Sequence, residues 1–128
     1  MCVLILFYFN IGVIWVLFNQ QLHAQVLQNN GGFITAEPGA FITVNGSVEN
    51  ESNGIINVDG SWASAAELYV TENITNNGLI EADGNIRLLG NWFNNNNFST
   101  NSGTVFLEGA NQLIGGTSES HFFNLIIY

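Results

Sequence analysis

The sequence has almost no positive charge. Among its 128 residues, Lys and Arg together occur once, as Arg87, against ten acidic residues, and the formal net charge is −9. Proteins that bind nucleic acid neutralise its phosphates with clusters of Lys and Arg. Anionic membrane surfaces also attract basic segments and repel acidic ones. The composition therefore argues against nucleic acid and against an anionic membrane surface as partners.

Cysteine is nearly absent as well. The one cysteine is Cys2, which lies at the start of an apolar N-terminal segment. If that segment is removed, the remaining chain has neither disulfides nor thiolate metal sites. We therefore expect the rest of the chain to be held by packing and hydrogen bonds alone.

A long apolar run occupies residues 2–18 and is followed by the polar residues 19–21 and the small residue Ala24. This order is typical of a secretory signal peptide. It predicts a hydrophobic signal helix within residues 1–24 that is cleaved before Gln25, so that no membrane segment is left. The alternative is a retained anchor, although the run only reaches the lower limit for spanning a bilayer and no basic residue flanks it to fix an orientation.

Glycine and asparagine recur at regular spacing in residues 25–128. Four blocks begin with a glycine, 22, 24 and 25 residues apart, and each has apolar or small residues two and four positions later and an acidic residue at the fifth position. The glycines are Gly32, Gly54, Gly78 and Gly103, and the acidic residues are Glu37, Asp59, Asp83 and Glu108.

A second segment recurs in the first three blocks and has apolar or glycine residues mainly at every second position. The apolar sets are Ile42, Val44 and Val48, then Leu68, Val70 and Ile74, then Ile86, Leu88 and Trp92. An asparagine follows two residues after each set, at Asn50, Asn76 and Asn94. A spacing of two places these side chains on one face of a strand. Only Ser61–Leu68 has a composition that suits a helical turn.

A period of 22–25 residues with short strands and Gly or Asn corners is typical of a solenoid. We therefore predict an all-β fold over residues 25–128, a right-handed parallel β-helix (β-solenoid) of about four coils. Asparagine side chains can form ladders between such coils. The alternative is an antiparallel β-sandwich, which gives no reason for the same residue types to recur at the same places.

The stretch from Gly103 to Tyr128 resembles a motif, G-x-V-x-F/L-x-G-x-x-Q-x-I-x-G-T-S followed by an aromatic residue and N-L-x-I, of large exported surface proteins of Bacteroidota. The matching residues are Gly103, Val105, Leu107, Gly109, Gln112, Ile114, Gly116, Thr117, Ser118, Phe123, Asn124, Leu125 and Ile127. The resemblance implies a secreted or outer-surface location and contact with the type IX secretion machinery during export. It also implies an adhesin-like structural role.

The chain ends within the apolar run Phe122–Tyr128 and lacks the C-terminal sorting domain of those proteins. Natural solenoids cover their last coil, because a bare apolar edge promotes aggregation. We therefore expect the sequence to be an N-terminal fragment of a longer protein, with a solenoid that is incomplete at its C-terminus.

The acidic residues of the four blocks are the first candidate for chemistry. In a β-helix they would form a column, one carboxylate per coil, that either binds Ca²⁺ weakly or makes solvated turns. Arg87 and His121 are the only basic side chains after the leader; they fall in different coils, and no nucleophile or metalloprotease motif accompanies them. We therefore expect no enzyme and no cofactor.

Exposed aromatic residues are the second candidate. Trp92 takes an inward position of the repeat and is expected to fill the core. Trp62, Tyr69 and Phe93 are expected to be the exposed aromatic residues, which could hold a glycan or another extracellular protein. Two functions remain open at this point, a structural segment of a surface protein and a binding module on one face of the solenoid.

Overall fold

A computed structural model of the chain describes residues 2–9, 12–19, 25–61 and 63–128. All secondary-structure elements in these residues are β-strands. No helix in this part of the chain is long and apolar enough to cross a membrane.

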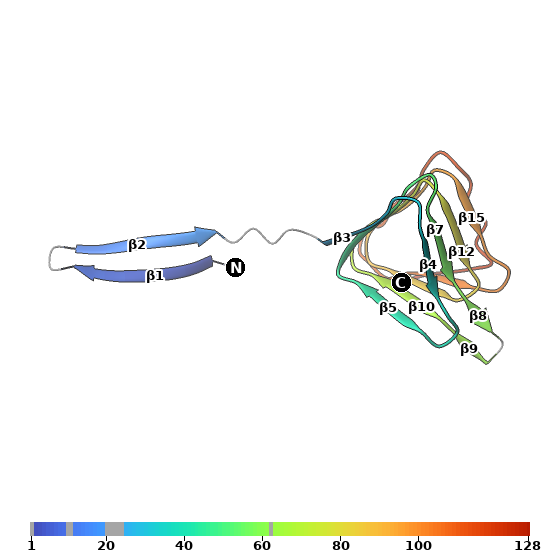
Figure 1. Cartoon of the computed structure of the whole chain (residues 1–128), viewed down its shortest axis with the longest axis horizontal. Helices are drawn as coiled ribbons and strands as arrows, with labels where there is room; N and C mark the ends of the chain where they lie inside the picture. Colours follow the sequence, from blue (N-terminus) through green and yellow to red (C-terminus); the bar gives the residue numbers. More distant parts are fainter. Residues whose placement is uncertain (1, 10–11, 20–24, 62) are drawn as a thin grey trace.

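Three parallel sheets form the sides of a roughly triangular solenoid, seen nearly end-on in Figure 1. We name each sheet by its first strand. The β3 sheet contains β3 (Gln25–Asn29), β6 (Gly46–Asn50), β11 (Ile74–Asn76), β14 (Trp92–Asn94) and β17 (Ile114–Gly115). The β4 sheet contains β4 (Phe33–Ala36), β7 (Ile55–Val58), β12 (Leu79–Ala82) and β15 (Asn97–Ser99). The β5 sheet contains β5 (Phe41–Val44), β10 (Glu67–Val70), β13 (Asn85–Leu88), β16 (Thr104–Leu107) and β18 (Asn124–Ile127).

The predicted parallel β-solenoid is confirmed, because neighbouring strands in all three sheets run parallel and the chain passes through the sheets in turn. The antiparallel sandwich is thereby excluded. The solenoid has about five turns, not four. The expected number was too low because it counted glycine blocks, and the last turn, which adds β17 and β18, contains no such block.

The predicted second segment stacks in the expected register. Leu68 of β10 lies between Ile42 and Ile86, and Ile74 of β11 lies between Val48 and Trp92. The asparagines that end this segment also pair, Asn50 with Asn76 and Asn76 with Asn94. In this segment, residues that recur in the sequence therefore lie side by side in neighbouring coils.

The fourth glycine block does not stack on the other three, which corrects the sequence alignment. The strand after Gly103 is β16, and its Val105 pairs with Ile86 in the β5 sheet. The position above Ile80 in the β4 sheet belongs to Phe98 of β15. The alignment was wrong because strands of both sheets share the pattern apolar-x-apolar, and the sequence does not say to which side of the triangle a strand belongs.

Inward side chains form a narrow continuous core. Trp92 is the largest of the fully buried side chains, and its ring packs edge-on against Phe98, with 4.9 Å between centroids, and against Phe122, at 5.6 Å. Its Nε1 donates a hydrogen bond to Ser120 Oγ at 3.0 Å. The expected core role of Trp92 is therefore confirmed, and the polar edge of the indole has the partner that burial demands.

A ladder of buried asparagines runs along the core at the end of the β3-sheet strands. Asn29, Asn50 and Asn76 each donate from Nδ2 to Oδ1 of the next asparagine, at 3.0, 2.9 and 2.9 Å. The last member, Asn94, donates to Glu119 O at 2.7 Å. Each rung replaces hydrogen bonds to water that burial removes, so the ladder is fully paired inside the protein.

The second coil carries an insert that departs from prediction. Residues expected to favour a helical turn form a small antiparallel hairpin, β8 (Gly60–Ser61) with β9 (Ser64–Ala65), just before β10. Asp59–Gly60 starts this hairpin, and Ser61 Oγ donates to Ser64 O at 3.0 Å. Ser and Gly favour turns over helix interiors, which accounts for the difference.

The N-terminal segment contains two strands. β1 (Cys2–Phe9) pairs antiparallel with β2 (Gly12–Asn19), where the sequence predicts a signal helix. The many β-branched and aromatic residues of both strands are compatible with strand structure. Cleavage of the segment stays a prediction, and Ala24 lies outside the described residues.

Candidate functional site

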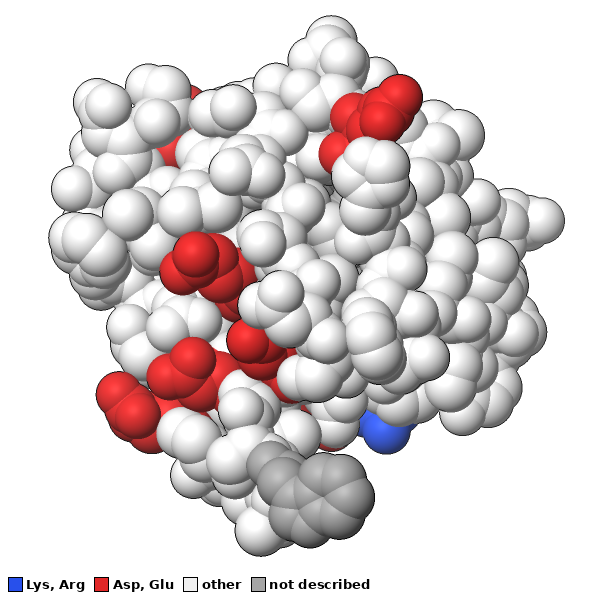
Figure 2. Space-filling view, turned by 90° about the vertical axis from the view of Figure 1, so that its right-hand side faces the viewer, with Lys and Arg blue, Asp and Glu red and all other residues white. Residues whose placement is uncertain are grey.

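The acidic corner after the β4-sheet strands is the first candidate site. Glu37, Asp59 and Asp83 follow register-matched residues of β4, β7 and β12, so they occupy the same corner in successive coils. Figure 2 shows carboxylates gathered on part of the face that carries β7, β12 and β15, with the single Arg side chain only at its lower edge. The predicted column therefore exists for three of its four members.

Glu108 is not part of this column, which corrects the prediction. It follows β16 in the β5 sheet, so it lies at another corner. The place above Asp83 is taken by Asn101, whose backbone N–H donates to Asp83 Oδ1 at 2.6 Å and whose Nδ2 donates to Oδ2 at 3.3 Å. This carboxylate thus holds the turn of the next coil.

No group of three or more His, Cys, Asp and Glu side chains in the described residues is arranged to hold a metal ion. Calcium prefers six to eight oxygen ligands converging on one point. Residues one coil apart along a straight corner do not converge in this way. The three carboxylates lie in turns one coil apart. Weak calcium binding at this corner stays an alternative interpretation.

Arg87 lies at the centre of an ionic cluster on the outer face of the β5 sheet. Its Nε donates to Glu67 Oε2 at 3.0 Å, and its Nη1 donates to Glu108 Oε1. Its guanidinium carbon lies 4.0 Å from the centroid of the Phe106 ring, in a cation–π contact. Glu67, Arg87 and Glu108 belong to three successive coils, so this one cation joins them.

The residues around Arg87 also shift its pKa. The hydrogen bond that Arg87 donates to Glu67 raises the pKa of Arg87 above its ordinary value, which burial alone would lower, and the negative charge of Glu108 adds to the rise. Tyr69 lies below Arg87 in the register and Phe106 lies above it. Arg87 therefore lies on the outer face of the sheet, with its Nε and Nη1 bound to two carboxylates of the protein itself.

The predicted binding aromatics do not share a face. Tyr69 lies on the half-buried outer side of β10 in the β5 sheet, whereas Phe93 lies on the outer side of β14 in the β3 sheet. Gly115 is the register partner above Phe93, so one side of this ring has no side chain stacked on it. Trp62, the third predicted member, lies outside the described residues.

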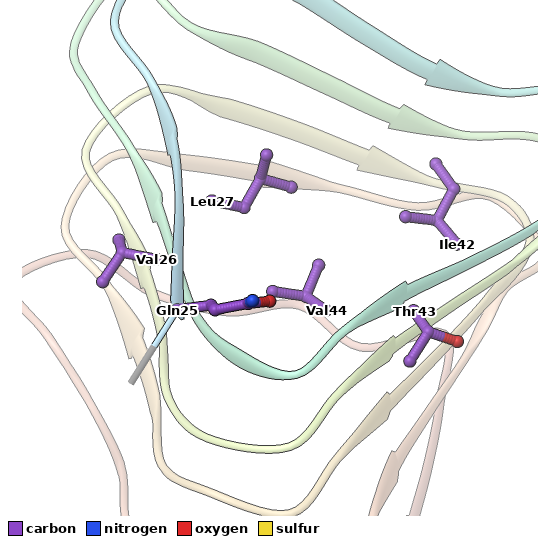
Figure 3. A pocket seen from close by; sticks show the side chains of 6 residues that line it. All are labelled: Gln25, Val26, Leu27, Ile42, Thr43 and Val44. Atoms are coloured by element: carbon purple, nitrogen blue, oxygen red, sulfur yellow. The ribbon is translucent and has the colours of Figure 1, made fainter. Parts of the chain in front are cut away.

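Of the two residues at the predicted cleavage site, Ala24 and Gln25, the structure describes only Gln25. Gln25 is the exposed first residue of β3. It helps to line a hollow of about 460 Å³ at the end of the first coil. Leu27, Ile42 and Val44 extend into this hollow from β3 and β5, as Figure 3 shows. These residues continue the apolar columns of the core, so the hollow is the open end of the core and carries no charged lining residue.

His121 does not join Arg87 in a catalytic arrangement. Its Nε2 lies 3.1 Å from Glu119 Oε2, and both side chains are more than 80% exposed. The segment that carries it precedes β18 in the fifth coil, whereas Arg87 belongs to the third. A general base works best in a site that excludes water, whereas this pair lies in solvent.

The structural roles of two residues were not predicted from the sequence. Asn29 is the first rung of the ladder, and its spacing of 21 residues from Asn50 is the signal that could have revealed it. Gln112 bridges a corner: its Oε1 accepts from Gly109 N at 2.8 Å, and its Nε2 donates to Leu88 O at 2.9 Å and also to Gly90 O. Gln112 and Gly109 both match the motif of residues 103–128, but the motif does not say what the Gln112 side chain contacts.

No protein-family model, curated protein or solved structure gave a significant match to the chain.

Proposed function

We propose that the chain is a non-enzymatic structural segment of an exported bacterial surface protein, a β-solenoid spacer of adhesin-like type. The proposal rests on a difference between the inner and outer positions of the coils: residue types repeat at inner positions and vary at outer ones. Inner positions repeat the same residue types, as in the asparagine ladder. The outer column through the middle of the β5 sheet instead reads Thr43, Tyr69, Arg87, Phe106 and Ile126.

This contrast is what a spacer requires. A single coil cannot bury its apolar face, so stability comes from contacts with neighbouring coils. Inner residues that match from coil to coil supply those contacts. A binding face would need a set of exposed side chains held toward one point, whereas Tyr69 and Phe93 lie on different sheets.

Export is the second part of the proposal and rests on the sequence. The apolar segment before Gln25 has the order of a signal peptide, and cysteine is confined to it. The resemblance of residues 103–128 to exported Bacteroidota proteins adds the type IX route and a secreted or outer-surface location. Mass spectrometry of the exported protein should find Gln25 at its N-terminus; a retained Met1 would contradict cleavage.

A glycan array probed with the full chain tests the spacer role against a binding module. We expect no specific glycan to bind, and we expect addition of glycans to leave the melting temperature unchanged. Specific binding that is lost in Tyr69→Ala, Phe93→Ala or Trp62→Ala would overturn the spacer role. The matched control is Thr75→Ala, a change on the outer face of β11 that removes no aromatic ring.

A further inference from the structure

Four Asn-Gly pairs occur in the chain, and each has the chemistry for spontaneous deamidation. They are Asn30–Gly31, Asn45–Gly46, Asn53–Gly54 and Asn77–Gly78. In this reaction the backbone nitrogen that follows the asparagine attacks the side-chain carbonyl carbon. Glycine in the second position favours the attack, because it has no Cβ to hinder the backbone rotation. The folded structure treats the four pairs very differently.

Asn77–Gly78 is locked between coils. Gly78 is buried, and its backbone N–H donates to Asn76 Oδ1 at 3.2 Å. Asn77 Oδ1 accepts a hydrogen bond from Asn95 Nδ2 at 2.9 Å. Both the attacking nitrogen and the attacked amide are therefore engaged, and the backbone cannot rotate without separating the coils.

Asn53–Gly54 and Asn45–Gly46 are restrained at the glycine. Gly54 is buried, and its N–H donates to Glu51 O at 2.7 Å. Gly46 is buried at the start of β6, so close to Gln25 of β3 that any Cβ there would collide with the Gln25 backbone. Although Asn45 and Asn53 themselves are exposed, rotation about the bond to the glycine is blocked in both pairs.

Asn30–Gly31 differs from the other three. It lies in the turn between β3 and β4 of the first coil, and both of its residues are exposed. Around Gly31 a Cβ would meet only Asn53, at 3.4 Å from its Cβ and 4.0 Å from its carbonyl oxygen. Gly31 also has a φ of 122°, a conformation that glycine reaches without strain. This pair alone combines an exposed amide with an exposed glycine.

We propose that Asn30 is the deamidation site of the folded protein. Hydroxide removes the Gly31 N–H proton, the nitrogen forms a bond with Asn30 Cγ, and the Cγ–Nδ2 bond breaks with release of ammonia. Water then opens the cyclic succinimide at either carbonyl, which leaves Asp or isoAsp at position 30. No electron donor or acceptor takes part.

The product has consequences for the neighbouring ladder. Asn29, the first rung, accepts from Gly32 N at 2.9 Å and donates to Gly32 O at 3.0 Å, so it clasps the turn that contains Asn30. Deamidation adds a negative charge to this turn, and isoAsp also lengthens its backbone by one methylene. The modification therefore falls where the asparagine ladder begins.

The test is peptide mapping of the folded full chain after incubation at mildly alkaline pH. Trypsin is of little use in a chain with one Arg and no Lys, but cleavage after glutamate places the four pairs in separate peptides, because Glu37, Glu49, Glu51 and Glu72 lie between them. The readouts are the one-dalton mass increase of each peptide and the release of ammonia. The chain incubated in denaturant serves as the unfolded reference, and Asn30→Gln is the matched variant.

Restrained pairs react only after local opening, and each 1.4 kcal/mol of opening free energy slows them about tenfold. We therefore expect the Asn30 peptide of the folded chain to react at least about tenfold faster than the other three, and all four to react at similar rates in denaturant. Asn30→Gln should remove most of the ammonia released. Equal rates in the folded chain, or a faster reaction at Asn45, Asn53 or Asn77, would overturn the proposal.

Discussion

Asn50 donates a hydrogen bond from Nδ2 to Oδ1 of Asn76 at 2.9 Å, and both side chains are completely buried. The same Nδ2 also reaches Gly54 O and Leu79 O, so one amide ties together the backbone of its own coil and of the next. Buried amides of this kind contribute most when every partner is present, because an unpaired buried group carries its full desolvation cost.

Removing one rung should therefore destabilise the whole solenoid. We expect Asn76→Ala to lower the free energy of unfolding by about 2–4 kcal/mol, since it leaves groups on both neighbouring coils without a partner. Urea unfolding of the full chain measures this change. The matched control is Asn57→Ala, on the half-buried outer side of β7, which should cost less than about 0.5 kcal/mol. Equal losses in both variants would contradict a stabilising ladder.

Close stacking of the coils predicts a second effect, at Gly78. A Cβ added at this buried glycine would collide with the carbonyl oxygens of Gly54 and Glu51 in the preceding coil. Backbone atoms cannot move aside as a flexible side chain can, so we expect Gly78→Ala to cost about 1–3 kcal/mol. Gly115→Ala is the control, because its Cβ would meet only side-chain atoms, of Phe93 at 3.4 Å and of Leu113 at 3.8 Å. If thermal unfolding ranks the two variants in the opposite order, the coil spacing described here is incorrect.

The cluster around Arg87 predicts a salt-dependent contribution to stability. Arg87→Gln removes the one cation between Glu67 and Glu108 and leaves two carboxylates near each other. Because the cluster is partly exposed and screened by solvent, we expect a loss of only about 1 kcal/mol at low salt, and less in high salt. Glu119→Gln, which removes the fully exposed contact to His121, should have no measurable effect. A loss at Arg87 that does not change with ionic strength would show that packing on Phe106, and not charge, is responsible.

The parts of the fold that could be predicted from the sequence are those where the same kind of residue recurs at the same position of each coil. Val48, Ile74 and Trp92 share a column because each must fill the same narrow core, and that requirement is visible in the spacing. Gly103 was assigned to the wrong column, because β12 and β16 obey the same inward-outward rule on different sides of the triangle.

The candidate site was less predictable, because its contacts depend on which coils are adjacent. Asp83 contacts Asn101 because the two residues are 18 positions apart in the sequence. This separation is shorter than the spacing between the glycine blocks. The partners of Arg87 lie 20 and 21 residues away on either side, in strands whose register only the structure defines. Local sequence could place these side chains on the outer face but could not say what they contact.

Successive coils stack in parallel, with Ser99 of β15 directly above Glu81 of β12. Cysteine cross-linking measures this directly, in a chain whose Cys2 is replaced by Ser. Neighbouring parallel strands bring paired residues within the distance that a disulfide spans. We predict that the pair Glu81→Cys with Ser99→Cys forms an intramolecular disulfide on mild oxidation, whereas Glu81→Cys with Phe106→Cys, the pairing that the sequence alignment implies, does not. A disulfide in the second variant but not in the first would contradict the solenoid register.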